Sequence, residues 1–269
     1  MLECVINVSE GRDPAVIGAI ATAAGRCLLD VHTDAGHNRS VLTLGGHREA
    51  VEGAARAVTE EGVRRIDLRR HTGAHPRLGA VDVVPFVPLG DTPLDAAIAA
   101  RHRFVAWAAS ELNVPCFCYG PERTLPDVRR RAFETLPPDT GPRQPHPTAG
   151  AICAGARPVL VAYNLWLAVG TPHDVARRIA AGLRSPQVRS LGLDVGGRAQ
   201  VSCNLVAPAA VGPAAVYDAV AAQAAIERAE LVGLIPVSAL AAIDPARWPA
   251  LDLDQDRTIE GRLAAPSGS

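Results

Sequence analysis

The chain of 269 residues contains no lysine, so all 27 of its cationic side chains are arginines. This absence excludes Schiff-base chemistry at a lysine amine, and it excludes a phosphate-binding loop that depends on lysine. Anionic groups of a ligand must therefore be held by arginine, histidine or backbone N–H groups. Arginine suits carboxylates because its planar guanidinium can donate to both oxygens.

A strong charge of one sign is also missing. The net charge is -1, so no overall field favours nucleic acid or an anionic membrane as a partner. No apolar run approaches the roughly 20 residues that span a bilayer. The first residues lack a basic region followed by a long apolar one, so we expect no signal peptide and a cytoplasmic protein.

The six cysteines offer little metal-binding chemistry. Cys116 and Cys118 form a short pair, but no second pair or histidine cluster completes a zinc set. Most of the cysteines are embedded in apolar, strand-like runs, which predicts buried free thiols.

The most informative stretch is residues 69–86, RRHTGAHPRLGAVDVVPF. It places two His, three Arg, an Asp and two Gly just before an apolar run. A solvated, arginine-rich turn is the plain interpretation of such a loop. A polar loop beside a buried strand is also where catalytic residues are often carried, and the residues discussed below favour that second interpretation.

Periodicity and capping signals predict the elements of the first half. Residues 2–8 alternate between an apolar and a polar face, and Asp13 with Pro14 marks a helix start. The elements expected are strand 2–8, helix 14–24, strand 27–33, strand 40–44, helix 48–61, strand 81–88, helix 94–112, strand 114–119 and helix 127–134.

The second half repeats that order. We expect Thr171 to cap a helix and Gly196-Gly197 to close a hairpin. The elements expected are strand 159–165, helix 172–183, strand 188–195, strand 198–206, helix 213–229, strand 231–236 and helix 238–243.

The expected fold is therefore α/β, of the α+β sandwich type, with two ferredoxin-like βαββαβ subdomains. We predict subdomains at residues 1–150 and 151–262, with a disordered tail at 263–269. Each sheet has a polar open face, so we expect the two subdomains to face each other across a ligand cleft. These polar face residues are Asn7, Ser9, His32, Asp34, Asn164, Gln200, Ser202 and Asn204.

Several motifs resemble those of formiminotransferase domains, in the same order along the chain. Residues 7–11 (NVSEG), 37–41 (HNRSV) and 71–83 (HTGAHPRLGAVDV) resemble N-F-S-E-G, the N-R-T-V element and H-x-G-E-H-P-R-M-G-A-x-D-V. Further matches follow at residues 113–120, 155–164, 201–205 and 230–236. The resemblance extends from Leu2 to about Ile243.

The resemblance implies two α/β subdomains with folate between them. It implies transfer of a formimino group from N-formimino-L-glutamate to N5 of tetrahydrofolate, the co-substrate, in histidine catabolism. It implies small-molecule partners. The family tendency and an exposed sheet edge lead us to expect a homodimer.

The resemblance assigns the catalytic histidine to His75. A group with a pKa near neutrality can accept the proton of the nucleophile and return it to the leaving nitrogen. The family orients this histidine with an Asp on the second strand, where the ungapped match here is His32. Asp34 lies two residues further on the same face and is our first choice, and Asp82 is the alternative.

Arg39 and Arg77 are candidates to bind the substrate carboxylates, although solvated arginines are an equal alternative. Asn7, Asn38 and Asn164 are candidates to fix polar edges of the ligands, and they are equally well explained as turn-capping residues. His37 belongs to the same matched element. The family's folate-contacting segment, G-P-S-x-F-V-P-S-W-G, matches Gly141, Pro142, Arg143, Gln144, Pro145, His146, Pro147, Thr148, Ala149 and Gly150.

Three departures from the family pattern motivate alternatives. Pro145 and Ala149 stand where the family has Phe and Trp, and Ala74 stands where it has Glu. These changes are compatible with a different donor or acceptor amine. Because His32 replaces the expected Asp, a folate- or metabolite-binding protein without turnover is a second alternative.

Overall fold

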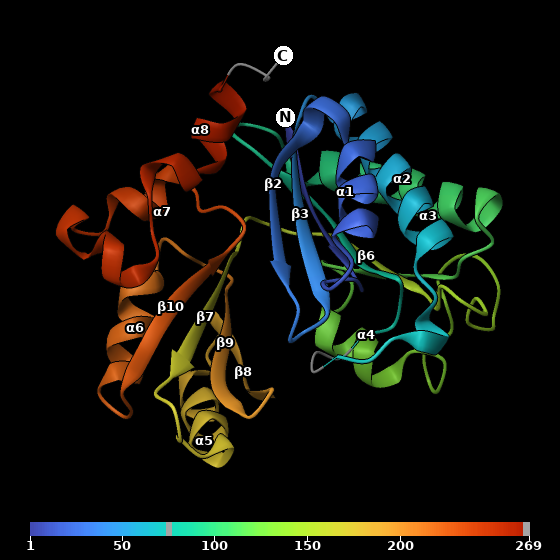
Figure 1. The fold of residues 1–269 in the computed structure, drawn as a ribbon. Helices are drawn as coiled ribbons and strands as arrows, with labels where there is room; N and C mark the ends of the chain where they lie inside the picture. Colours follow the sequence, from blue (N-terminus) through green and yellow to red (C-terminus); the bar gives the residue numbers. More distant parts are fainter. Residues whose placement is uncertain (74–76, 266–269) are drawn as a thin grey trace. The chain divides into compact units, whose positions relative to one another are not determined.

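The computed structural model describes residues 1–73 and 77–265, and its contacts divide the chain into two units, Met1–Pro158 and Val159–Ser269. Each unit is described by itself (Figure 1). The division falls later than the boundary expected at residue 150, because the strand Ile152–Ala156 pairs within the first sheet. The expected cleft between the units stays a prediction.

The first unit contains the expected βαββαβ order. Its strands β1, β2, β3 and β4 follow one another as β2-β3-β1-β4 in the sheet, the ferredoxin-like arrangement. The elements are β1 (Leu2–Val8), α1 (Pro14–Ala23), β2 (Leu28–Asp34), β3 (Arg39–Gly46), α2 (Arg48–Arg65) and β4 (Val81–Pro88).

Local sequence explains these elements. Alternate residues of β1, from Leu2 to Val8, are buried in the core under the helices. Asp13 caps α1 as predicted, since its carboxylate accepts the N–H groups of Ala15 and Val16.

Two parallel strands extend this sheet beyond the ferredoxin-like core. These strands, β5 (Cys116–Tyr119) and β6 (Ile152–Ala156), follow α3 (Leu94–Glu111) in the chain. The strand order of the whole sheet is β2-β3-β1-β4-β6-β5. Helices α1, α2 and α3 cover one face (Figure 1). Helix α4 (Leu125–Arg131) packs on the other, where Val128 joins a small cluster with Val83 of β4, Phe117 of β5 and Cys153 of β6.

The second unit has the same βαββαβ order without the extension. Its sheet has the order β10-β7-β9-β8, which is again ferredoxin-like, with α5 and α6 packed against one face (Figure 1). The elements are β7 (Val161–Leu167), α5 (His173–Leu183), β8 (Val188–Val195), β9 (Arg198–Leu205), α6 (Pro213–Ala221) and β10 (Ile226–Val232), followed by α7 (Val237–Ala241), η3 (Pro245–Leu251), η4 (Gln255–Arg257) and α8 (Ile259–Ala264).

Some predicted bounds were wrong. The helix that begins at Pro213 ends at Ala221, because the chain then turns into β10 instead of reaching Ala229. The last strand is Ile226–Val232 and not 231–236, since a bulge near its start lets charged residues join it. Thr171 does not cap α5, because its hydroxyl donates to the carbonyl of Ala168. Strand β6 was not predicted, and the expected tail begins inside α8.

The cysteines are free thiols as predicted, and all except the half-buried Cys27 are buried. Burial raises the pKa of Cys116 to about 12 and that of Cys118 to about 11. Both thiols therefore stay protonated at neutral pH. Within residues 1–73 and 77–265, no helix is long and apolar enough to cross a membrane.

Candidate functional site

The open face of the first sheet collects predicted site residues from three neighbouring strands. Asn7 of β1 lies opposite Val41 of β3, and Asp34 of β2 lies opposite Arg39 of β3. The neighbours of Asn7 on β1 belong to the core under the helices, so Asn7 lies on the other face, and the strand pairing places Asp34 and Arg39 on that same face. The expectation that Asp34 continues the face of His32 is confirmed, because β2 extends to Asp34.

Arg39 is held by a neutral side chain. Its Nε donates to Oδ1 of Asn7 at 3.1 Å, and its Nη2 donates to the same oxygen. Burial lowers the pKa of Arg39 to about 10, with Asp82 acting in the opposite direction. Below that pH the guanidinium is a poorly hydrated cation, which is the state that gains most from an anionic ligand.

The turn between β2 and β3 is fixed by Asp34 and Asn38. The Asp34 carboxylate accepts the backbone N–H of His37 at 2.7 Å, and its other oxygen lies 4.0 Å from the His37 ring. Asn38 adopts a left-handed φ of 49°. Its side chain accepts the N–H of Gly11 at 2.9 Å and donates to the carbonyl of Thr72 at 3.0 Å. Asn38 thus joins the turn at Gly11 to Thr72, which lies in the stretch 69–86 described above.

Arg77 continues this contact from the other end of the loop. Its guanidinium donates to the carbonyl of His37 at 3.1 Å and more weakly to that of Asn38 at 3.4 Å, and it also contacts the His71 ring. His71 in turn contacts the Asn38 carbonyl at 3.0 Å. Burial lowers the pKa of His71, and Arg77 adds to that effect. His71 is therefore neutral at physiological pH.

Asp82 lies at a β-bulge. Val8 pairs with Val81, but Asn7 pairs with Val83, so Asp82 is the extra residue on β4. The bulge lets Val81 and Val84 both enter the core under the helices while Asp82 stays out of it. A strictly alternating strand would have placed Asp82 on the apolar face.

The Asp82 carboxylate is buried and fully engaged. One oxygen accepts the N–H of Leu78 at 2.7 Å and, less closely, that of Gly79 at 3.4 Å. The other accepts Nη2 of Arg129 on α4 at 2.6 Å. Asp82 is committed to the loop and to Arg129, so between the two carboxylates Asp34 is the better candidate partner for a catalytic histidine.

The segment matched to folate contact lies against the same loop. The Ala80 N–H donates to the carbonyl of Ala149 at 2.9 Å, and the Ala151 N–H donates to that of Leu78 at 2.9 Å. The His146 ring accepts the Ala149 N–H at 3.0 Å and closes the turn. Residues 149–151 are therefore paired with residues 78–80.

Within this segment the side chains divide into two groups. Ala149 is buried in the core and presents no surface to a ligand. Arg143, Gln144 and Pro145 are exposed, together with Gly141 and Pro147, whereas Pro142, Thr148 and Gly150 are half-buried. The exposed part thus carries polar groups and a proline where the family pattern has an aromatic ring.

Asn164 belongs to the second unit, on β7. Its side-chain amide donates to Glu230 of β10 at 3.1 Å, and the indole N–H of Trp166 donates to the same carboxylate oxygen at 2.9 Å. The Arg228 guanidinium lies over the Trp166 ring, 4.5 Å from its centroid. Asn164 is therefore part of a polar cluster on the open face of the second sheet.

His75 lies outside the described residues, as do Ala74 and Pro76. Its role and its pairing with Asp34 stay predictions. Among the remaining predicted residues, the structure brings together Asn7, Asp34, His37, Asn38, Arg39, Arg77, Asp82 and the segment 146–150 through shared strands and hydrogen bonds.

The sequence prediction missed three groups at these positions. Arg129 was hidden in a run of three arginines that looks like a solvated helix face. His71 opens the motif at residues 71–83, and the motif alone gives it no separate role. Glu230 alternates with core residues on β10, and that alternation is the signal that could have identified it.

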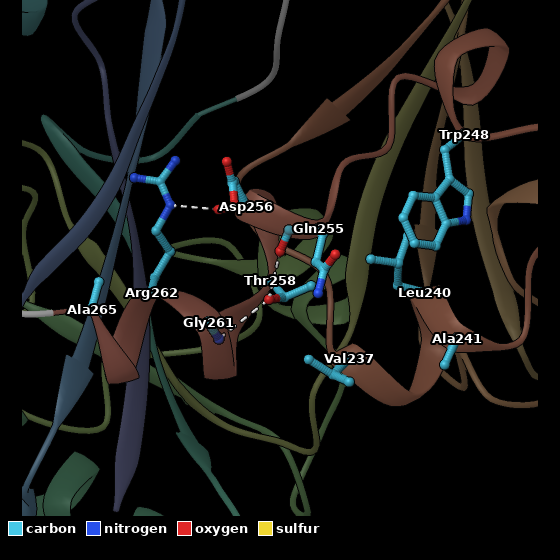
Figure 2. A pocket seen from close by; sticks show the side chains of 10 residues that line it. All are labelled: Val237, Leu240, Ala241, Trp248, Gln255, Asp256, Thr258, Gly261, Arg262 and Ala265. Atoms are coloured by element: carbon cyan, nitrogen blue, oxygen red, sulfur yellow. Dashed lines mark hydrogen bonds between the residues drawn. The ribbon is translucent and has the colours of Figure 1, made fainter. Parts of the chain in front are cut away.

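A separate hollow lies in the second unit. It has a volume of about 720 Å³ and is lined by α7, η3, η4 and α8, with Trp248 and Leu240 at one end and Arg262 at the other (Figure 2). The Arg262 Nε donates to the carbonyl of Asp256 at 2.7 Å. None of the predicted site residues lines this hollow.

Comparison of the sequence with known proteins shows the family of the chain. Residues 1–157 match the sequence model of the formiminotransferase domain, N-terminal subdomain. The chain is 35% identical to a glutamate formimidoyltransferase of Streptococcus pyogenes serotype M1, over 92% of each protein. It is 33% identical to a glutamate formimidoyltransferase of Thermoplasma acidophilum, covering 92% of this chain and 91% of that protein.

A longer relative contains the same region. The chain is 35% identical to the formimidoyltransferase-cyclodeaminase of Rattus norvegicus, and the match covers 89% of this chain but 51% of that protein. The chain thus spans about half the length of this bifunctional relative. These similarities show that the chain belongs to the formiminotransferase family of enzymes.

Proposed function

We propose that this enzyme transfers a formimino group from N-formimino-L-glutamate to N5 of tetrahydrofolate. The observation that carries the proposal is the pairing of residues 149–151 with residues 78–80. It joins the segment matched to folate contact to the loop that follows the expected catalytic histidine. The names of the relatives, glutamate formimidoyltransferase, support the donor.

The reaction forms a bond from N5 of the folate to the formimino carbon and breaks the bond from that carbon to the glutamate nitrogen. N5 loses a proton on attack, and the departing nitrogen gains one. In our proposal His75 accepts the first proton and supplies the second, so that no further co-reactant is needed. Asp34, on the open face of the first sheet, is the proposed carboxylate that stabilises the protonated ring.

Arginine supplies the recognition of charge. Arg39 is anchored by a neutral amide oxygen, and Arg77 is anchored by backbone carbonyls at the neighbouring turn. A carboxylate of the donor therefore gains a charge-assisted contact at either guanidinium. Asn7 and Asn38 hold these groups in place, and His37 supplies one of the carbonyls.

A different acceptor amine is the second candidate. The observation that favours it is the absence of an aromatic ring on the segment 141–150, where Pro145 is exposed and Ala149 is buried. Such rings give apolar or stacking surface to a pterin. Polar contacts from the exposed Arg143 and Gln144 would have to replace that surface if folate binds.

Titration calorimetry with a tetrahydrofolate analogue, followed by a transfer assay with formiminoglutamate, tests the proposal. We expect micromolar folate binding and formation of 5-formiminotetrahydrofolate with release of glutamate. Transfer to another amine, with no folate binding at millimolar concentration, would support the second candidate. We also propose a homodimer, which light scattering on the purified protein tests.

A further inference from the structure

Arg129 forms an ion pair with Asp82 that links helix α4 to the loop before β4. It is part of α4, whose neighbouring Val128 is fully buried against the open face of the first sheet. Its guanidinium donates to Asp82 at 2.6 Å, and the Asp82 side chain is almost completely buried. Asp82 in turn holds the N–H groups of Leu78 and Gly79. Arg129 is thus connected through one carboxylate to the loop next to Arg77.

The same carboxylate acts electrostatically on Arg39. Three guanidiniums, those of Arg39, Arg77 and Arg129, lie close enough for Arg77 and Arg129 to lower the pKa of Arg39, although burial has the larger effect. Asp82 is the carboxylate that opposes them at Arg39. This group of side chains therefore carries an excess of positive charge.

The positions of the hydrogen bonds decide where that excess lies. One carboxylate oxygen of Asp82 accepts from Arg129, and the other accepts from backbone N–H groups. In the described residues, the side chain that accepts from Arg39 is the neutral Asn7. Because Asp82 accepts directly from Arg129, its charge is offset mainly there, and Arg39 keeps a neutral hydrogen-bond acceptor.

We propose that Arg129 is a positioning residue that keeps the Asp82 carboxylate away from Arg39, so that Arg39 stays available to a carboxylate of the ligand. Without Arg129, the buried Asp82 would lack its cation and would compete with the ligand for Arg39. The ligand class is a dicarboxylate of the size of glutamate. Its identity as the formimino donor rests on the proposed function, whereas the anion site does not.

A double-substitution series on the full chain tests this role. The probes are L-glutamate and glutarate in titration calorimetry, with formiminoglutamate in the transfer assay. For Arg129→Gln we expect at least a tenfold weaker binding of both dicarboxylates and a matching rise in KM, with kcat changed less than threefold. For Arg129→Lys we expect a smaller loss, because the charge is kept.

The second substitution separates positioning from simple structural damage. Adding Asp82→Asn to Arg129→Gln removes the competing charge but keeps an oxygen for the Leu78 N–H. We expect the double variant to recover most of the dicarboxylate affinity. If Arg129 only supported the fold, the double variant would bind no better than the single one, and that result would overturn the inference.

Controls keep the outcomes separate. Arg123→Gln breaks a more exposed pair of the same type, since Arg123 donates at 2.8 Å to Asp139, which also accepts the Cys118 N–H. We expect it to leave dicarboxylate binding unchanged, and thermal unfolding checks that every variant is folded. Dicarboxylate binding that follows the predicted order without any transfer would defeat the proposed function alone. Wild-type protein that transfers normally, with no change in Arg129→Gln, would defeat this inference alone.

Discussion

The two units share a strand order but differ in what their open faces carry. On the open face of the first unit, Arg39 donates to the amide oxygen of Asn7, and Asp82 accepts a hydrogen bond from Arg129. On the open face of the second unit, Asn164 and Trp166 both donate to the carboxylate of Glu230. One scaffold therefore presents an excess of cations in one unit and an indole with a carboxylate in the other. The two open faces thus differ in a few side chains, although the topology that carries them is the same.

The units also differ in how the chain reaches the site. The first sheet has two extra strands, and the segment before β6 pairs with the loop before β4. The second sheet ends at β8 and β10 without such an addition. Residues distant in the sequence are thus joined at the first unit's site, and the substitutions below probe that difference.

The largest effect is expected from the catalytic histidine. Replacing His75 with Ala should lower kcat by about 100-fold to 10,000-fold, because the proton transfer loses its acid and base. His173→Ala in the second unit, where the ring contacts the Gly192 carbonyl at 3.2 Å, should leave kcat near wild type. Transfer assays on both variants provide the measurement. Equal activity in the two would refute the assignment of His75.

Glycine substitutions compare the space available to an added Cβ in the two units. Gly150 has a φ of 67°, and an added Cβ would lie 2.1 Å from the Leu78 carbonyl oxygen. Gly150→Ala should therefore cost about 3 kcal/mol or more of unfolding free energy. Gly197, with a φ of 80° in the β8–β9 hairpin, has open space, so Gly197→Ala should cost about 1 kcal/mol. Urea unfolding measures both, and a larger loss for Gly197→Ala would contradict the expected order.

Arginine substitutions compare the two charged faces. Arg39→Met should raise KM for formiminoglutamate by about tenfold to a hundredfold, the usual value of a hydrogen bond to a charged group. Arg228→Met removes a half-exposed guanidinium from the face of Trp166, and such a contact is worth about 0.5–1 kcal/mol. Steady-state kinetics should show less than about a threefold change for it. A comparable rise in KM for Arg228→Met would show that the second face also binds the donor.

The smallest effect concerns pH. Burial lowers the pKa of His71 in the folded state, so the unfolded chain binds a proton more readily below about pH 6.5. The contribution of His71 to stability is therefore complete above that pH and falls as the solution is acidified. Unfolding midpoints between pH 5 and 7.5 should fall more steeply on acidification for the wild type than for His71→Gln. Parallel curves would contradict the shift.

The sequence predicted those features that depend on local signals. The alternation of residues 2–8 gave β1 at its observed bounds, and Gly196-Gly197 gave the β8–β9 hairpin. Strand β6 was missed because its partners, β4 and β5, are parallel and distant, so no neighbouring turn marks it. The helix from Pro213 was made too long because its alanine-rich continuation has high helix propensity, while the strand pairing of β10 overrides it.

The site was predictable in its residues but not in its connections. The motifs identified Asn7, Arg39 and Asp82, yet the pairing of Asp82 with Arg129 depends on a bulge and on a helix from another part of the chain. Asp82 was considered as a partner of the histidine. In the structure its oxygens hold Leu78 and Arg129, which no spacing in the sequence indicates.

The hydrogen bonds that join residues 78–80 to residues 149–151 also bear on how the first unit folds. The strands β1 to β4 pair within the first third of the chain, whereas this junction closes a loop that contains α3, β5 and α4. Closing such a long loop is entropically slow. We therefore expect the site to be assembled at the end of folding, and a fragment that stops before residue 146 to have ferredoxin-like secondary structure without a competent loop.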